Sequence, residues 1–256
     1  MEWIKYHEAE KVFDLRTEHS TYQMQVREYD TLVHLYYGSP VGDALITDRI
    51  VCVDRGFSGN PYDAGEDRTY SMDTLPQEFP CYGNGDFRST AFAVENADGS
   101  MSCDLRYKSH KILDGKYSLE GLPAVYANDE EAQTLEILME DQVTKVKVVL
   151  LYGVLPEQDI ITRSVRVKNE SNGKIYLNKI ESASLDFLYG NYDLLTFYGR
   201  HAMERNVQRV PVVHGTQKIG SVRGTSSHQY NPMMILAESE TTEDKGNCYA
   251  MSFVYS

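Results

Sequence analysis

Two long stretches without a regular apolar pattern, residues 54–88 and 189–228, hold the strongest candidates for chemistry. Stretches of this length are uncommon inside a compact domain and are usually functional, because loops present binding groups on a rigid scaffold. Asp54 opens the first stretch. From the residues alone, the favoured interpretation of Asp54 is a structural ion pair with the nearby Arg55 or Arg68.

Other charged residues in these stretches are predicted to be structural. Asp86 and Arg88 could act in catalysis, but an Asp between Gly85 and Phe87 at a strand entrance is more typical of a turn residue or ion-pair partner. We interpret the dense charged run of the second stretch as an ion-pair network that anchors the loop or a subunit interface. The run consists of Arg200, Glu204, Arg205 and Arg209.

The histidines, glycines and cysteines predict no metal site and no cofactor. His110, His214 and His228 lack the spacing of metal ligands, and the glycines of residues 215–224 lack the strand-to-helix context of a phosphate-binding loop. The four cysteines contain no C-x-x-C pair, so neither a thiolate zinc site nor a disulfide framework is indicated. A reducing, cytoplasmic location is therefore expected.

Charge and hydropathy exclude two classes of partner. The chain has 256 residues, with 38 acidic against 25 basic side chains and a net charge of −13. Nucleic acids are bound by basic surfaces, so no nucleic-acid partner is expected. The longest apolar stretch, residues 148–155, is far shorter than the roughly 20 residues of a membrane-spanning helix. Residues 1–20 contain no apolar run typical of a signal peptide, and no membrane partner is expected.

The elements that must position these residues are predicted to be β-strands. Nineteen tyrosines and repeated alternation of apolar with polar residues suit half-buried strands. Asn172-Gly173 lies between segments 160–169 and 174–185 and predicts an antiparallel hairpin, because Asn-Gly is the strongest short hairpin signal. The other predicted strands are 12–16, 22–27, 31–36, 91–95, 103–113, 143–151, 233–238 and 248–255.

Many short strands and almost no amphipathic helix predict an all-β fold, a large antiparallel β-sandwich. No repeat or linker divides the chain, so residues 1–256 are predicted to form one domain. The last predicted strand runs to Ser256 with no turn or polar tail after it. We therefore expect this domain to be incomplete at its C-terminal end.

Several long segments resemble one known family. They are Asp54-Arg55-Gly56-Phe57-Ser58 together with residues 67–68, 71–80, 82–88, 192–196, 199–209 and 220–232. Together they closely resemble the amino-terminal β-supersandwich domain of bacterial α-galactosidases of glycoside hydrolase family 36. The resemblance covers residues 4–256, and matches of this length are far more specific than a single short motif.

The resemblance implies a retaining enzyme that hydrolyses terminal α-D-galactosyl residues of melibiose- and raffinose-type sugars, commonly as a cytoplasmic homotetramer. Retaining hydrolysis requires two carboxyl groups about 5 Å apart. In the family these are aspartates of a (β/α)8 barrel, expected downstream of Ser256. No catalytic residue is therefore expected in this chain, which should be inactive alone and should serve to position substrate and to form the oligomer.

The resemblance also assigns two residues to substrate binding. Asp54 matches a family aspartate that accepts hydrogen bonds from sugar hydroxyls, a role that suits a carboxylate. His201 stands where the family commonly has the tryptophan of a Gly-x-Trp-x-x-Glu-Arg segment. Because imidazole covers less of a sugar ring than indole does, either the site is more polar here or His201 does not contact substrate.

Two other functions fit the sequence. The chain could be an autonomous, lectin-like carbohydrate-binding sandwich, although such modules usually use aromatic platforms and only one tryptophan is present. It could also be a complete small glycosidase that uses its own carboxylates. Sugar binding by the isolated chain would favour the first of these, and turnover of a chromogenic α-galactoside by the isolated chain would favour the second.

Overall fold

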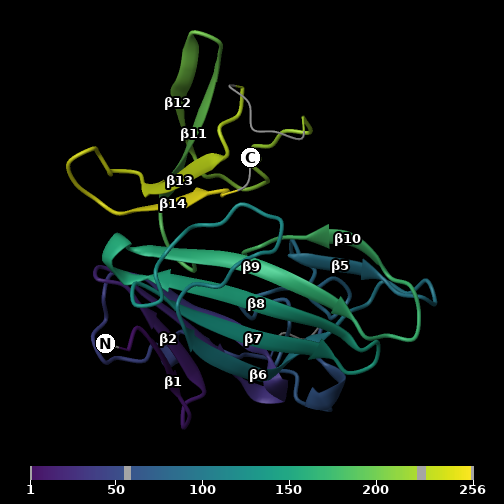
Figure 1. Cartoon of the computed structure of the whole chain (residues 1–256). Coiled ribbons are helices and arrows are strands. Elements are labelled where there is room, and N and C mark those ends of the chain that lie inside the picture. Colours follow the sequence, from purple (N-terminus) through teal and green to yellow (C-terminus); the bar gives the residue numbers. More distant parts are fainter. Residues whose placement is uncertain (1, 55–58, 224–228, 255–256) are drawn as a thin grey trace. The chain divides into compact units, whose positions relative to one another are not determined.

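Strands are the main regular elements of the chain, as Figure 1 shows for the computed structural model. The structure describes residues 2–54, 59–223 and 229–254. The antiparallel all-β prediction is confirmed. Two compact units are present. Unit 1 comprises Met1–Tyr117 and Tyr126–Asp186, and unit 2 comprises Ser118–Val125 and Phe187–Ser256.

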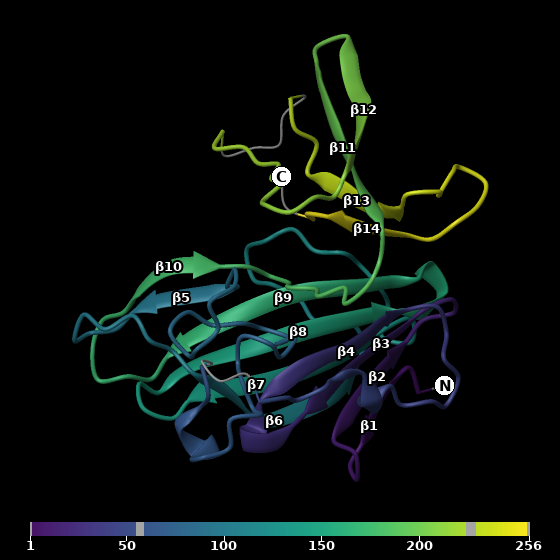
Figure 2. The same ribbon diagram turned by 180° about the vertical axis from the view of Figure 1, so that it is seen from behind.

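Unit 1 contains two four-stranded antiparallel sheets that share one core (Figures 1 and 2). The first sheet consists of β1 (Ile4–His7), β2 (Val12–Arg16), β3 (Thr21–Val26) and β4 (Leu32–Gly38). The second consists of β6 (Leu105–Asp114), β7 (Gln133–Asp141), β8 (Val146–Leu155) and β9 (Ile160–Asn169). In both sheets the strands are paired in chain order. A separate antiparallel pair joins β5 (Phe92–Glu95) to β10 (Tyr176–Ile180).

The main core lies between these two sheets. Phe13 and Leu15 of β2 point into it, as do Leu135 and Ile137 of β7 and Tyr152 of β8, and all five are fully buried. Burying one such side chain contributes roughly 1.5–3 kcal/mol, so this core accounts for much of the stability of unit 1. Among the described residues, the loops contain the short 3-10 segments η1 (Glu28–Asp30), η2 (Thr47–Arg49), η3 (Tyr62–Ala64) and η4 (Pro156–Gln158).

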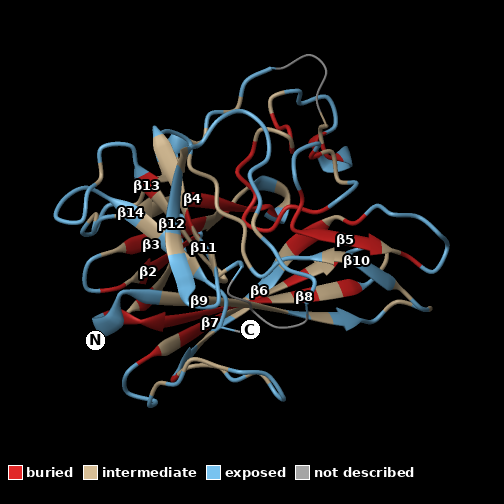
Figure 3. Ribbon diagram, turned by 90° about the horizontal axis from the view of Figure 1, so that it is seen from above, coloured by how far each residue is buried: buried red, intermediate tan, exposed pale blue. Residues whose placement is uncertain are grey.

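Unit 2 contains one antiparallel sheet of order β12-β11-β13-β14. Its strands are β11 (Tyr192–Arg200), β12 (Met203–Pro211), β13 (Met233–Glu238) and β14 (Cys248–Ser252). The last two of these strands, β13 and β14, are antiparallel neighbours. The prediction that residues 189–228 are irregular is wrong for β11 and β12, which form a hairpin. Because the side chains of β12 are largely exposed on both faces, the hairpin has no apolar alternation to reveal it (Figure 3).

The predicted hairpin at Asn172-Gly173 is also wrong. In the described part of the chain, β9 pairs only with β8, and β10 pairs with β5 of the small sheet. The preferred hairpin turn needs a positive φ at both central residues, and neither residue has one. Instead Asn169 accepts a hydrogen bond from the Ser171 backbone N–H at 3.0 Å and turns the chain toward another sheet. Gly173 is needed there for close packing, since a Cβ atom would lie 2.5 Å from Ala97 Cβ.

Candidate functional site

A second apolar cluster holds the stretch that contains Asp54. The cluster lies on the face of the β1–β4 sheet opposite the main core. Its buried members are Val12, Val33 and Leu35 from the sheet and Ala64, Tyr70, Met72 and Leu75 from the stretch. The partly buried Ile50 and Cys52 pack against it, and Cys52 is only two residues before Asp54. The chain is thus partly buried at Ile50 and Cys52, shortly before Asp54, and is largely buried again in residues 70–81.

Two glycines bring distant parts of the stretch into contact. A Cβ atom on Gly59 would lie 2.2 Å from the carbonyl oxygen of Gly85, so any side chain at residue 59 would displace the backbone. The carbonyl of Gly59 also accepts a hydrogen bond from the Met72 N–H at 3.1 Å. The chain is thus fixed at residue 59. Residues 55–58, which include the predicted partner Arg55, lie outside the described residues.

Asp54 lies at the surface of unit 1 beside Arg68. One carboxylate oxygen of Asp54, Oδ1, is 3.3 Å from Nη2 of Arg68, and 57% of each side chain is exposed. The pairing predicted from the residues is therefore present. An exposed carboxylate beside a guanidinium can accept hydrogen bonds from hydroxyl groups while the guanidinium donates to others. This arrangement suits a polyhydroxylated ligand, although the substrate-binding role of Asp54 stays a prediction.

Asp86 and Arg88 form the ion pair predicted from the sequence. Arg88 donates from Nε and Nη2 to the Asp86 carboxylate at 3.0 and 2.8 Å, and from Nη2 to the carbonyl of Leu75 at 2.6 Å. Gln77 also donates to Asp86, at 2.8 Å. The hydrogen bonds to Asp86 and the Asp186 carboxylate raise the pKa of Arg88. This network closes the loop of residues 75–88 upon itself and has a structural role.

Sequence reasoning missed a buried polar cluster around Glu78. The Glu78 carboxylate is fully buried, and its Oε1 atom accepts hydrogen bonds from the hydroxyls of Tyr22 at 2.6 Å and Tyr152 at 2.8 Å. Arg163 Nη1 lies 2.9 Å from the same oxygen, and His34 Nδ1 lies 3.4 Å from Oε2. The only signal in the sequence is one acidic residue within the otherwise neutral segment 75–80.

The charges in this cluster compensate one another. Burial alone would raise the pKa of Glu78, but the positive charge of Arg163, the nearby His34 and the hydrogen bond from Tyr22 outweigh it and lower the pKa below 4.5. Burial, followed by the repulsion of Glu78, raises the pKa of Tyr22 well above 10. Glu78 is therefore ionised at neutral pH, and it connects the first polar stretch to both sheets of unit 1.

His201 lies in the turn between β11 and β12 in unit 2, whereas Asp54 belongs to unit 1. The imidazole is 95% exposed, and its Nδ1 atom lies 4.0 Å from Oε1 of Glu204. Of the predicted charged network, Arg209 is the best anchored: its Nε atom lies 2.6 Å from the Asp193 carboxylate. Its Nη atoms donate to backbone carbonyls of residues 238, 239 and 241, which ties the hairpin to the turn after β13.

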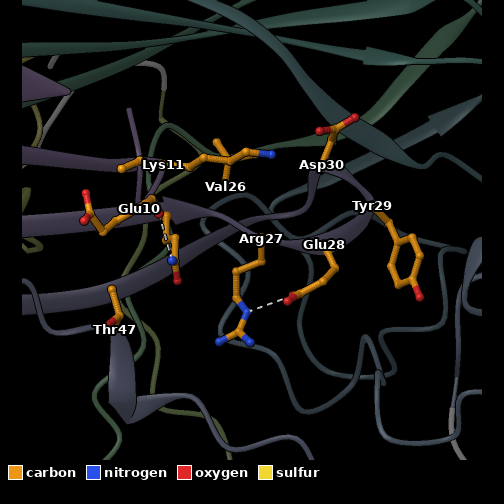
Figure 4. Close-up of a pocket in the computed structure, with 10 residues that line it drawn as sticks. Glu10, Lys11, Val26, Arg27, Glu28, Tyr29, Asp30 and Thr47 are labelled. Atoms are coloured by element: carbon orange, nitrogen blue, oxygen red, sulfur yellow. Dashed lines mark hydrogen bonds and ion pairs between the residues drawn. The ribbon is translucent and has the colours of Figure 1, made fainter. Parts of the chain in front are cut away.

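A separate open hollow of about 470 Å³ is present in unit 1 (Figure 4). It lies where the β1–β2 and β3–β4 turns meet η2. Its charged lining residues are Glu10, Lys11, Arg27, Glu28 and Asp30. Arg27 Nε donates to Glu28 at 3.2 Å. The hollow offers both hydrogen-bond donors and acceptors, as a neutral polar ligand requires, but Asp54 does not line it.

No cluster of three or more metal-binding side chains occurs among the described residues. In the part of the chain that the structure describes, no helix is long and apolar enough to cross a membrane.

Comparison with known proteins identifies the family. The model of the glycosyl hydrolase family 36 N-terminal domain matches residues 30–256. The bifunctional alpha-galactosidase/sucrose kinase AgaSK of Mediterraneibacter gnavus is 56% identical over 254 residues, which cover 99% of this chain and 27% of that protein.

Solved structures agree with this match. The galactosidase domain of AgaSK superposes with a TM-score of 0.95 at 56% identity, over 98% of this chain and 35% of that one. An alpha-galactosidase AgaA variant from Geobacillus stearothermophilus in complex with raffinose gives a TM-score of 0.89 at 41% identity, over 94% of this chain and 33% of that one. The chain thus spans about a third or less of these relatives, and it belongs to glycoside hydrolase family 36 as an N-terminal domain.

Proposed function

We propose that the chain is the substrate-positioning and oligomer-forming part of a retaining α-galactosidase that acts on melibiose- and raffinose-type galactosides. The relatives named above are alpha-galactosidases, and one of them was solved with raffinose bound. The two catalytic carboxyl groups belong to a part of the enzyme outside this chain. This chain is therefore inactive alone. Cys52, Cys81, Cys103 and Cys248 are free thiols, which supports a cytoplasmic location because thiols stay reduced there.

The observation that carries the positioning role is the placement of Asp54. Its carboxylate is exposed on a loop that the second apolar cluster fixes just before it. A fixed, exposed carboxylate can accept hydrogen bonds from sugar hydroxyls without reorganising the loop. Asp54 accordingly binds the galactoside. His201, exposed at the tip of the β11–β12 hairpin, is also proposed as a substrate-binding residue.

The oligomer-forming role is assigned to unit 2. β12 is an edge strand, and Met203 and Val207 on it are 51% and 60% exposed. A long edge strand with exposed apolar side chains is suited to association with another chain. The partner is another subunit of a homo-oligomer. Sedimentation of the full-length enzyme carrying Val207→Lys tests this role: the oligomer should dissociate, and an unchanged sedimentation coefficient would contradict the assignment.

The positioning role is tested by Asp54→Ala in the full-length enzyme, with raffinose as substrate. A hydroxyl contact remote from the scissile bond contributes equally to the ground state and the transition state. Loss of a hydrogen bond to a charged group, about 1.5–3 kcal/mol, should therefore raise KM roughly ten- to a hundredfold and change kcat little. An unchanged KM would remove Asp54 from the site.

A second candidate function is autonomous carbohydrate binding, favoured by the polar hollow beside η1. Calorimetry of the isolated chain with raffinose separates the two functions. Millimolar or tighter binding that Asp54→Ala leaves intact and Arg27→Ala abolishes would favour a lectin-like module. No binding by the isolated chain would agree with the galactosidase role, because the remainder of the site is then missing.

A further inference from the structure

We propose that Arg68 is a positioning residue for substrate binding, which orients the Asp54 carboxylate for the sugar. This inference rests on the proposed function of Asp54. Arg68 Nη2 lies 3.3 Å from Asp54 Oδ1. A carboxylate has about four acceptor sites, so one guanidinium contact uses only part of the capacity of Asp54 to accept hydrogen bonds.

Hydrogen bonds of its neighbours hold the backbone on both sides of Arg68. The Asp67 carboxylate accepts hydrogen bonds from the N–H and the hydroxyl of Thr69, at 2.8 and 2.7 Å. Asn60 Nδ2 donates to the Asp67 carbonyl at 2.5 Å. On the other side of Arg68, the nearly buried Tyr70 donates its hydroxyl to the Glu28 carbonyl at 2.9 Å.

These contacts fix the backbone on both sides of Arg68. The Arg68 side chain therefore starts from a fixed backbone position, which allows the guanidinium to hold the Asp54 carboxylate in one orientation.

A purely structural role does not explain the pair. Both side chains are 57% exposed, and ion pairs this exposed contribute little to stability. The loop between residues 59 and 75 is already held by the second apolar cluster and by the hydrogen bonds of Asn60 and Thr69. A pair that the fold does not need, next to the carboxylate proposed to bind sugar, is explained by orientation of that carboxylate.

The test is a double-mutant cycle in the full-length enzyme, with raffinose as substrate. The variants are Arg68→Gln, Asp54→Ala and the double substitution, together with Arg68→Lys. Arg68→Gln should raise KM about fivefold with kcat nearly unchanged, which corresponds to about 1 kcal/mol. In the double variant KM should be no higher than in Asp54→Ala, because Arg68 acts through Asp54. Arg68→Lys should recover part of the loss, since lysine keeps the charge but not the planar fork.

Arg166→Gln is the matched control. Arg166 Nη1 on strand β9 lies 3.4 Å from Oε1 of Glu136 on β7, and the two side chains are 48% and 23% exposed. The control should leave KM unchanged, and neither arginine variant should lower the melting temperature of the isolated chain.

Three outcomes would overturn the inference. The first is a KM for Arg68→Gln equal to that of the control. The second is a KM of the double variant that equals the product of the two single effects on KM. A loss of thermal stability without a change of KM is the third. If Asp54→Ala itself leaves KM unchanged, the proposed role of Asp54 fails as well, which distinguishes that failure from one confined to Arg68.

Discussion

Replacing Glu78 with glutamine should be among the most damaging single changes in the chain. The carboxylate is fully buried, and Arg163, whose side chain is only 10% exposed, lies 2.9 Å from it. Glutamine keeps the shape but leaves the Arg163 charge uncompensated, and breaking a buried ion pair in this way costs about 3–5 kcal/mol. Single domains unfold with only about 5–15 kcal/mol, so the loss is a large fraction of the total.

Urea unfolding of the isolated chain, followed by circular dichroism, measures this loss. With a urea m-value of about 2–3 kcal/mol/M, the midpoint should fall by roughly 1–2 M. Glu136→Gln is the matched control: its carboxylate is 23% exposed and pairs with Arg166, so the expected change is below about 1 kcal/mol.

Equal midpoint shifts for the Glu78 and Glu136 variants would refute the reasoning. If Glu78→Gln does not fold, Tyr152→Phe tests the same cluster, because it removes one hydroxyl donor and should cost about 1.5–3 kcal/mol.

Three further predictions concern Glu78, Gly59 and His201. The lowered pKa of Glu78 means that its ionised form stabilises the fold above pH 4.5, and this contribution is lost as the pH falls through the folded-state pKa. The acid-induced loss of stability below pH 4.5 should therefore be smaller in Glu78→Gln than in the wild type, and equal slopes would contradict this. Gly59→Ala should destabilise the isolated chain by about 1–3 kcal/mol and raise the KM of the full-length enzyme, because the Cβ atom collides with the Gly85 carbonyl. His201→Trp should lower the KM for raffinose several-fold if this residue faces the sugar, since indole offers a larger apolar face, about 1 kcal/mol more stabilising; an unchanged KM would place His201 outside the site.

Local signals in the sequence predicted the elements whose partners are near in the chain. The strand at residues 12–16 and the strand at residues 233–238 were predicted with the bounds that the structure shows. The Asp86–Arg88 pair spans two residues and was equally accessible. In each case a short apolar segment or a short spacing between partners is a local feature, so the sequence pattern is sufficient.

The errors occurred where a distant segment decides the outcome. Asn172-Gly173 carries a strong hairpin signal, yet β10 pairs with β5, a strand about eighty residues earlier, and Gly173 packs against Ala97. Turn chemistry alone cannot reveal such a competing strand. The β11–β12 hairpin escaped notice for the opposite reason, because exposure of both faces removes the alternation that marks a strand. The single domain predicted for residues 1–256, incomplete at its C-terminal end, stays a prediction, because two units can belong to one domain.

The candidate site combines contacts between residues near in the chain with contacts between distant segments. The Asp67–Thr69 turn that flanks Arg68 is local and spans two residues. The Glu78 cluster joins the same polar stretch to Tyr22 and Tyr152, which are 56 and 74 residues away. A match to the family can identify Asp54 as a candidate substrate-binding residue. The position of its carboxylate, however, depends on the packing of the folded sandwich. Substitutions in the Glu78 cluster should therefore weaken substrate binding in the full-length enzyme without touching the sugar, and they should do so in proportion to the stability they remove from unit 1.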